Sequence, residues 1–182
     1  MRRALLALAI AAPLAGCALD QHRFERPARL RVGATSHALA TDTPGAVARS
    51  TTPTTTESLA RNARTMSAQF TMATRDETFF AGGEVEAGVL DTERSNFAGA
   101  YGIAGVQLVG RVGTVGAELA TGWRGLRDDG DDVNSYIAEP RLRAELRFAP
   151  QWTLGAVGGA TMGERGSWMG GIYLGVHSRA FE

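Results

Sequence analysis

Apolar and polar side chains alternate with a period of two over most of the chain from Thr65 onward. The cleanest such run, Tyr136–Phe148, has Tyr, Ala, Pro, Leu and Phe at its even positions and Ile, Glu and Arg at its odd positions. Successive side chains of a strand point to opposite faces, so this run predicts a β-strand with one apolar and one charged face. A helix would mix the two sets on every face.

The same alternation, interrupted by polar turn residues, predicts seven strands after residue 64. An eighth segment before them is shorter and weaker, and its assignment stays open. In Phe97–Val109 both faces carry small or apolar residues, so the pattern does not show which face of this strand is the apolar face of the sheet. The eight predicted strands are Arg29–Ala40, Thr65–Thr74, Thr78–Leu90, Phe97–Val109, Gly113–Gly125, Tyr136–Phe148, Trp152–Met162 and Trp168–Ala180.

Short and long connections alternate along these strands. The short links are Arg75–Glu77, Gly110–Val112 and Ala149–Gln151, and the long ones are 41–64, 91–96, 127–133 and 163–166. The Thr-rich segment 41–64 is the longest of them. Outer-membrane barrels have short periplasmic turns and longer outer loops. With eight strands, both chain ends fall on the side of the short turns.

An antiparallel sheet with one apolar face must cover that face with protein or with lipid. It can close into an up-and-down barrel whose apolar face points outward into a membrane. It can also form a soluble barrel or sandwich with the apolar face inside. In the first case the charged face fills an interior that eight strands leave just wide enough for side chains. The charges predicted for that interior are Glu84, Glu86, Glu118, Arg124, Glu139, Arg141, Arg143, Glu145, Arg147 and Arg179.

Aromatic residues near the strand ends favour the membrane barrel, because they would form the girdles found at both interfaces. They are Trp123, Tyr136, Phe148, Trp152 and Trp168. In pattern, residues 28–182 resemble the small eight-stranded outer-membrane barrels of the OmpA-like and OmpX-like kind. That family tends to end in an aromatic residue, whereas here Phe181 is penultimate and Glu182 is last.

The N-terminus reads as a secretory signal. Arg2 and Arg3 precede an apolar stretch, Ala4–Leu14, that is too short to span a membrane. The tetrapeptide Leu14-Ala15-Gly16-Cys17 resembles the lipobox of bacterial lipoproteins. This resemblance implies a signal peptide over 1–16, acylation of Cys17 and a flexible tether over 17–27, and Ala18 implies sorting to the outer membrane. The alternative is a plain secreted protein.

Charge and cysteine content limit the classes of partner and bond that this chain can form. Removal of Arg2 and Arg3 leaves 17 basic residues against 19 acidic ones, so there is no basic surplus for nucleic acid. Cys17 is the single cysteine, which excludes an internal disulfide. The lipobox and barrel resemblances imply outer-membrane lipid as the partner, contacted by the Cys17 acyl chains and by the barrel exterior.

No residue pattern points to a cofactor, a metal site or a phosphate-binding loop. His22, His37 and His177 are scattered, and Asp128–Asp132 lacks the spacing of a calcium loop, so it reads as an acidic outer turn. His177 and Ser178 are adjacent on a predicted strand and would point to opposite faces, which excludes a catalytic pair.

The sequence therefore predicts a lipid-anchored outer-membrane barrel with a structural or surface-interaction role and no enzymatic activity. The alternative is a lipid-tethered periplasmic barrel or sandwich that binds a small ligand.

Overall fold

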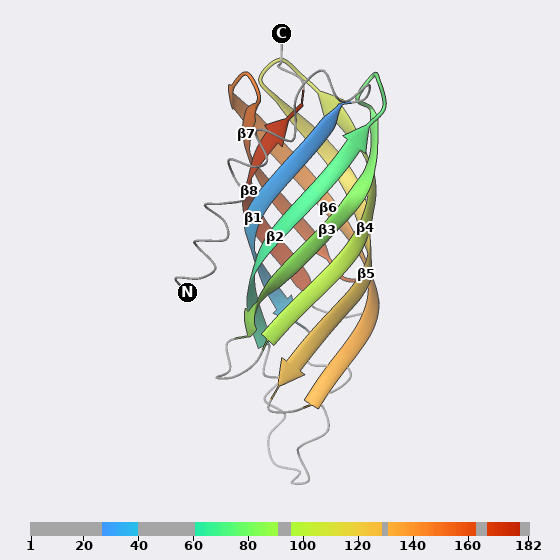
Figure 1. Cartoon of the computed structure of the whole chain (residues 1–182), viewed down its shortest axis with the longest axis vertical. Helices are drawn as coiled ribbons and strands as arrows, with labels where there is room; N and C mark the ends of the chain where they lie inside the picture. Colours follow the sequence, from blue (N-terminus) through green and yellow to red (C-terminus); the bar gives the residue numbers. More distant parts are fainter. Residues whose placement is uncertain (1–26, 40–60, 91–95, 129–130, 163–166, 179–182) are drawn as a thin grey trace.

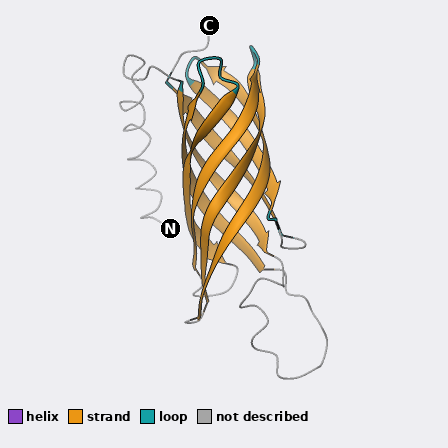
Figure 2. Cartoon of the chain, turned by 90° about the vertical axis from the view of Figure 1, so that its right-hand side faces the viewer, coloured by secondary structure: helices purple, strands orange, loops and turns teal. Residues whose placement is uncertain are grey.

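The chain forms a closed, all-antiparallel barrel of eight β-strands (Figures 1 and 2). The computed structural model describes residues 27–39, 61–90, 96–128, 131–162 and 167–178. Within these residues there is no helix long and apolar enough to cross a membrane. The strands are β1 (Ala28–Leu39), β2 (Arg61–Ala73), β3 (Phe79–Leu90), β4 (Asn96–Val109), β5 (Gly113–Asp128), β6 (Asp131–Ala149), β7 (Trp152–Ala160) and β8 (Trp168–His177). The predicted all-β barrel is confirmed, including its uncertain first strand.

Strand β1 closes the barrel, because it pairs with β2 on one side and with β8 on the other. Following the pairing once around the barrel from Val133 of β6 leads back to Arg143 of the same strand, ten residues further on. Such an offset requires tilted strands, with tilts of about 35–45° typical of barrels. The tilt is visible in Figure 1.

The two ends of the barrel differ. The connections β2–β3, β4–β5 and β6–β7 lie at one end, named here the short-turn end, together with Pro27 and Ser178. The opposite end is named the loop end. At the short-turn end, the Ala28 amide donates to Ser178 Oγ at 2.9 Å and the Ser178 amide donates to the Ala28 carbonyl at 2.8 Å. These bonds join the beginning and the end of the barrel wall.

Two predicted loops are shorter than expected. The loop predicted over 127–133 is wrong, because β5 continues to Asp128 and β6 starts at Asp131. Asp and Gly are depleted in strands, which makes this segment look like a loop. The pairing of Asn96 with Arg127, and of Arg127 with Asp132, overrides that preference. The Thr-rich loop predicted over 41–64 ends earlier than expected, since β2 starts at Arg61, and 40–60 lie outside the described residues.

Close approach of neighbouring backbones requires glycine at position 82 of β3. A Cβ atom on Gly82 would lie 1.9 Å from the Phe70 carbonyl oxygen of β2, which is far inside van der Waals contact. The adjacent Gly83 is open, and its Cβ would come no closer than 3.6 Å, to the Tyr101 carbonyl oxygen. The two glycines therefore have different roles although they are neighbours in sequence.

We expect Gly82→Ala to lower the free energy of unfolding by about 1–3 kcal/mol, because the β2 backbone must move to accept the methyl group. Gly83→Ala is the matched control and should leave stability within about 0.5 kcal/mol. Urea titration of the protein folded into phospholipid vesicles, followed by tryptophan fluorescence, measures both values. Equal effects of the two substitutions would contradict the assigned backbone contact.

Candidate functional site

The barrel interior is charged and electrically balanced. Five arginines and five glutamates are at most 8 % exposed there. Isolated buried charges are very unfavourable, so such groups must be paired and hydrogen-bonded. The ten residues are Arg29, Arg31, Arg124, Arg141, Arg143, Glu84, Glu86, Glu118, Glu139 and Glu145.

Arg141 of β6 is the centre of this network. Its Nη1 donates to both carboxylate oxygens of Glu84, at 2.9 and 3.0 Å, and its Nε donates to Glu139 at 2.7 Å. Glu118 lies 3.7 Å from the same Nη1. Arg143 in turn donates to Glu118 at 2.7 and 3.2 Å. Alternate residues of β6 thus connect carboxylates that come from β3, β5 and β6 itself.

Gln69 links this centre to a second group of charges nearer the short-turn end. It donates to Glu84 at 3.0 Å and accepts from Arg31 at 2.8 Å. Arg31 also donates through Nε to Glu145 at 2.6 Å, and the Tyr173 hydroxyl donates to the same carboxylate oxygen at 3.1 Å. A neutral amide therefore bridges these two ion-paired groups into one polar network.

The network ends in an apolar layer toward the loop end. Glu86 accepts from the Tyr101 hydroxyl at 2.5 Å and from Thr65 at 3.2 Å, and it lies 3.1 Å from His37. The His37 ring stacks on Phe97 with 4.9 Å between ring centroids. Phe97 belongs to a buried apolar cluster with Leu39, Ala63 and Leu90. This cluster covers the charges on the loop side.

The β2–β3 turn covers the interior at the short-turn end. Arg29 bonds to Gln107 and to the Glu77 carboxylate, and Gln107 donates to the Glu77 carbonyl oxygen at 2.6 Å. Glu77 has a left-handed backbone with φ of 58°, which is uncommon for a residue other than glycine. In the same turn, hydrogen bonds from Thr74 and Thr78 hold the pKa of Asp76 below its usual value. The turn is thus fixed to the interior network through one glutamate.

The interior leaves no room for a small ligand in its charged middle. The hollow between Arg31, Gln69, Glu84 and Arg141 has a volume of about 20 Å³, which is close to that of one water molecule. Sites for small molecules usually measure about 300–1,000 Å³. The arrangement can therefore hold the wall together but cannot accommodate a ligand or an open channel at this level.

The charged residues predicted for the interior differ in their burial. Glu84, Glu86, Glu118, Arg124, Glu139, Arg141, Arg143 and Glu145 are buried. Arg147 is half-buried at the short-turn end, where it donates to the Arg111 carbonyl oxygen at 3.5 Å. Arg179 lies outside the described residues.

Sequence reasoning missed further members of the network, among them Arg29, Arg31, Gln69, Tyr101 and Gln107. Arg29 and Arg31 alternate with apolar residues, which indicates an inward position. This indication is weak because the predicted first strand is short. Tyr101 lies in the strand whose two faces could not be distinguished. Gln69 and Gln107 are uncharged, so they cannot be identified from a pattern of paired charges.

The outer face of the barrel is apolar. Among the strand residues whose side chains are described, the only exposed charged ones are Arg64 and Arg127, both toward the loop end. The exposed large apolar side chains include Val85, Val89, Val115, Leu142, Leu146, Leu154 and Ile172, each at least 55 % exposed. A soluble protein arranges these two residue classes the other way round. The alternative of a sandwich, or of a barrel with its apolar face inside, is therefore wrong.

Aromatic side chains lie near both ends of this apolar surface. Trp123, Tyr136 and Trp168 are exposed toward the loop end, and Phe79 and Phe148 are exposed toward the short-turn end. Trp123 and Tyr136 are direct partners on β5 and β6. Trp152, also predicted to belong to a girdle, is half-buried beside Ala28 and Val176.

The remaining candidate chemistry does not assemble. His177 lies 3.3 Å from both Glu145 and Thr153, whereas Ser178 accepts from the Ala28 amide. Ser178 was expected on the face opposite to His177, but β8 ends at His177 and Ser178 is itself buried. Across the described segments, no group of three or more His, Cys, Asp or Glu side chains is arranged to hold a metal ion.

The fold is similar to that of solved surface-protein structures. Neisserial surface protein A matches with a TM-score of 0.53 and 10 % identity, over 86 % of this chain and 97 % of that one. Ail, the attachment invasion locus protein of Yersinia pestis, matches in complex with the heparin analogue sucrose octasulfate, with a TM-score of 0.51 and 10 % identity, over 85 % and 99 % of the two chains. No protein-family model matches the sequence. No curated protein matches it either.

We expect Arg141→Met to lower the free energy of unfolding by about 3–5 kcal/mol, because it leaves Glu84 and Glu139 without their main counter-charge. Adding Glu84→Gln should recover part of this loss. Arg111→Met, in the β4–β5 turn, is the control for loss of an exposed arginine. Urea titration in vesicles measures the free energy of unfolding of the wild type, Arg141→Met, Arg141→Met with Glu84→Gln, and Arg111→Met. A loss no larger than that of the control would show that Arg141 does not hold the network together.

We expect Glu77→Ala to be more destabilising than Glu77→Gly by about 1 kcal/mol. Both variants lose the bond to Arg29, but glycine adopts the left-handed backbone without the cost of about 1–2 kcal/mol that other residues incur. Thermal unfolding of the two variants in the same detergent measures the difference. The reverse order would contradict the conformation assigned to this turn.

Proposed function

We propose that this protein is an outer-membrane β-barrel, additionally anchored by acyl chains on Cys17, with a structural or surface-interaction role. The observation that carries the proposal is the separation of residue classes across the wall. Paired charges fill the interior, and apolar side chains cover the outside. This arrangement is stable where the surroundings are hydrocarbon, since lipid-facing and lumen-facing residues alternate along the strands of a membrane barrel.

The position of the lipid anchor supports an orientation. Pro27, at the short-turn end, follows Cys17 by ten residues, and ten extended residues reach at most about 36 Å. An acylated Cys17 in the inner leaflet of the outer membrane is therefore within reach of the short-turn end. The short turns then face the periplasm, as is usual for such barrels, and the loop end faces outward.

A surface-interaction role is supported by the structural neighbours. Their names describe a surface protein and an attachment invasion protein, and the loop end of this barrel carries the two longest connections, β1–β2 and β7–β8. A catalytic role finds less support, because His177 and Ser178 bond to different partners. A ligand-binding role inside the barrel is disfavoured by the filled interior.

Membrane fractionation of cells that express the full chain or its Cys17→Ala variant tests the proposal. Labelled palmitate should be incorporated by the wild type and not by the variant. Both should stay in the membrane pellet after a carbonate wash, because the barrel spans the bilayer without the anchor. Both should also migrate faster on gels when they are not boiled, as folded barrels do.

The two parts of the proposal can fail separately. Release of the Cys17→Ala variant as a folded monomer into plain buffer would disprove the membrane-spanning barrel. Equal palmitate labelling of the two proteins would disprove acylation at Cys17 and leave the barrel unaffected.

A further inference from the structure

A small polar hollow lies inside the barrel, where the charges around Arg141 meet those around Arg31. Its volume is about 20 Å³. A single water molecule needs at least about 10–15 Å³ of such space. The hollow is enclosed, because the residues that line it include Arg31, Gln69, Arg141, Met169 and Tyr173, each at most 5 % exposed.

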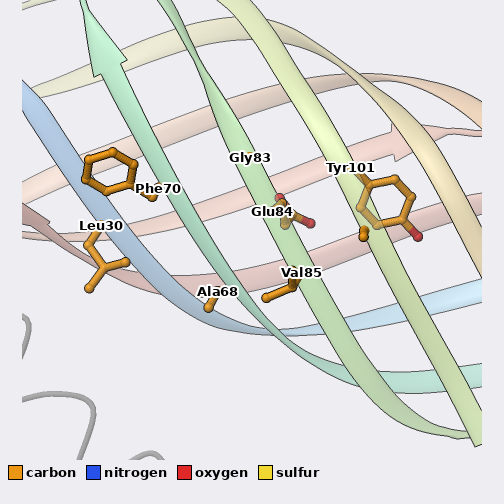
Figure 3. Close-up of a pocket in the computed structure, with 8 residues that line it drawn as sticks. Leu30, Ala68, Phe70, Gly83, Glu84, Val85 and Tyr101 are labelled. Carbon is orange, nitrogen blue, oxygen red and sulfur yellow. The ribbon is translucent and has the colours of Figure 1, made fainter.

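Strand β3 closes the hollow toward the outside. Glu84 is buried and lines the hollow, whereas its neighbour Val85 is exposed on the outer face. Figure 3 shows both side chains, with the apolar groove on the outside that Val85 and Phe70 line. A molecule in the hollow is therefore separated from this groove by the wall of the barrel.

Two arginines that line the hollow each have one nitrogen without a hydrogen-bond acceptor. Arg31 and Arg141 both donate through Nε and Nη1 to interior side chains. The Nη2 atom of each arginine is buried and has no hydrogen-bond partner among the described residues. Buried polar groups are nearly always hydrogen-bonded, to protein or to ordered water. Two such donors at one hollow therefore require an acceptor inside it.

We propose that the hollow binds one water molecule, which accepts hydrogen bonds from Arg31 Nη2 and Arg141 Nη2. The hydroxyls of Thr35 and Ser67 and the carboxylate of Glu84 also line the hollow, and they can accept the two protons of this water. A buried water usually makes two to four hydrogen bonds. The water thus joins the two ion-paired groups at a second point besides Gln69. This inference goes beyond the proposed function, because it does not depend on where the barrel is located.

The charge balance of the interior favours water over a small anion such as chloride, which would also accept from two arginines. Five buried arginines already face five buried glutamates. A bound anion would add a buried negative charge without a counter-charge, which is very unfavourable. Neutral water satisfies the same N–H groups and keeps the balance.

X-ray radiolytic labelling of the full chain in detergent tests the site, because hydroxyl radicals formed from water oxidise the nearest side chains. Tyr173 and Tyr101 are a matched pair: both are 5 % exposed, and both donate their hydroxyl to an interior glutamate. Of the two, Tyr173 lines the hollow. We expect mass spectrometry of the peptides to show faster oxidation of Tyr173 than of Tyr101. Equal rates would overturn the proposal, and so would labelling of Tyr173 in sulfate buffer that chloride abolishes.

The variant Ser67→Val tests the position of the water, because its methyl groups fill the hollow. It should slow the oxidation of Tyr173 to the rate of Tyr101. It should also raise the equilibrium constant of unfolding in urea about tenfold, because two buried N–H groups lose their acceptor. Ser36→Val makes the same change at an exposed position of β1 and should leave the oxidation of Tyr173 unchanged. Unchanged oxidation of Tyr173 in Ser67→Val would overturn the proposal, and if this variant does not fold, the comparison of the two tyrosines in the wild type decides.

Discussion

The structure depends on one constraint, which is that every charge on the strands away from the loop end must be neutralised inside the wall. Several of the five buried arginines and five buried glutamates meet this condition by ion pairs between different strands. A pair such as Arg31 and Glu145 joins the first strand to the sixth. Breaking such a pair leaves a buried charge that neither water nor lipid can stabilise, so the network ties the whole wall together.

Glycine makes this filled interior possible. Tyr101 lies over Gly99 and Tyr173 lies over Gly155, with each ring where a Cβ atom of the glycine would be. Each tyrosine also donates its hydroxyl to an interior carboxylate, Glu86 or Glu145. The high glycine content, 23 of 182 residues, therefore has a packing role: it makes space for large polar side chains inside a narrow barrel.

Much of the wall was predictable, because a period of two reports which face a residue occupies. It identified all eight strands and the inward position of residues such as Glu84 and Arg141. The pattern could not show which charges pair, since the partners of Arg141 come from strands whose relative register depends on closure. It also failed where local preference and pairing disagree, as at Asp128 and Asp131, and where both faces are small, as around Tyr101.

The ten-residue offset of the barrel has a consequence for its assembly. An even offset returns each strand to its own inward face, whereas an odd offset would make a strand's inner face meet its neighbour's outer face. A slip of β1 by one residue would turn Arg29 and Arg31 to the outer face, which is toward hydrocarbon in the proposed membrane setting. An arginine at the midplane of a bilayer costs about 2–4 kcal/mol. If the barrel spans a bilayer as proposed, the bilayer would therefore disfavour mispaired closures.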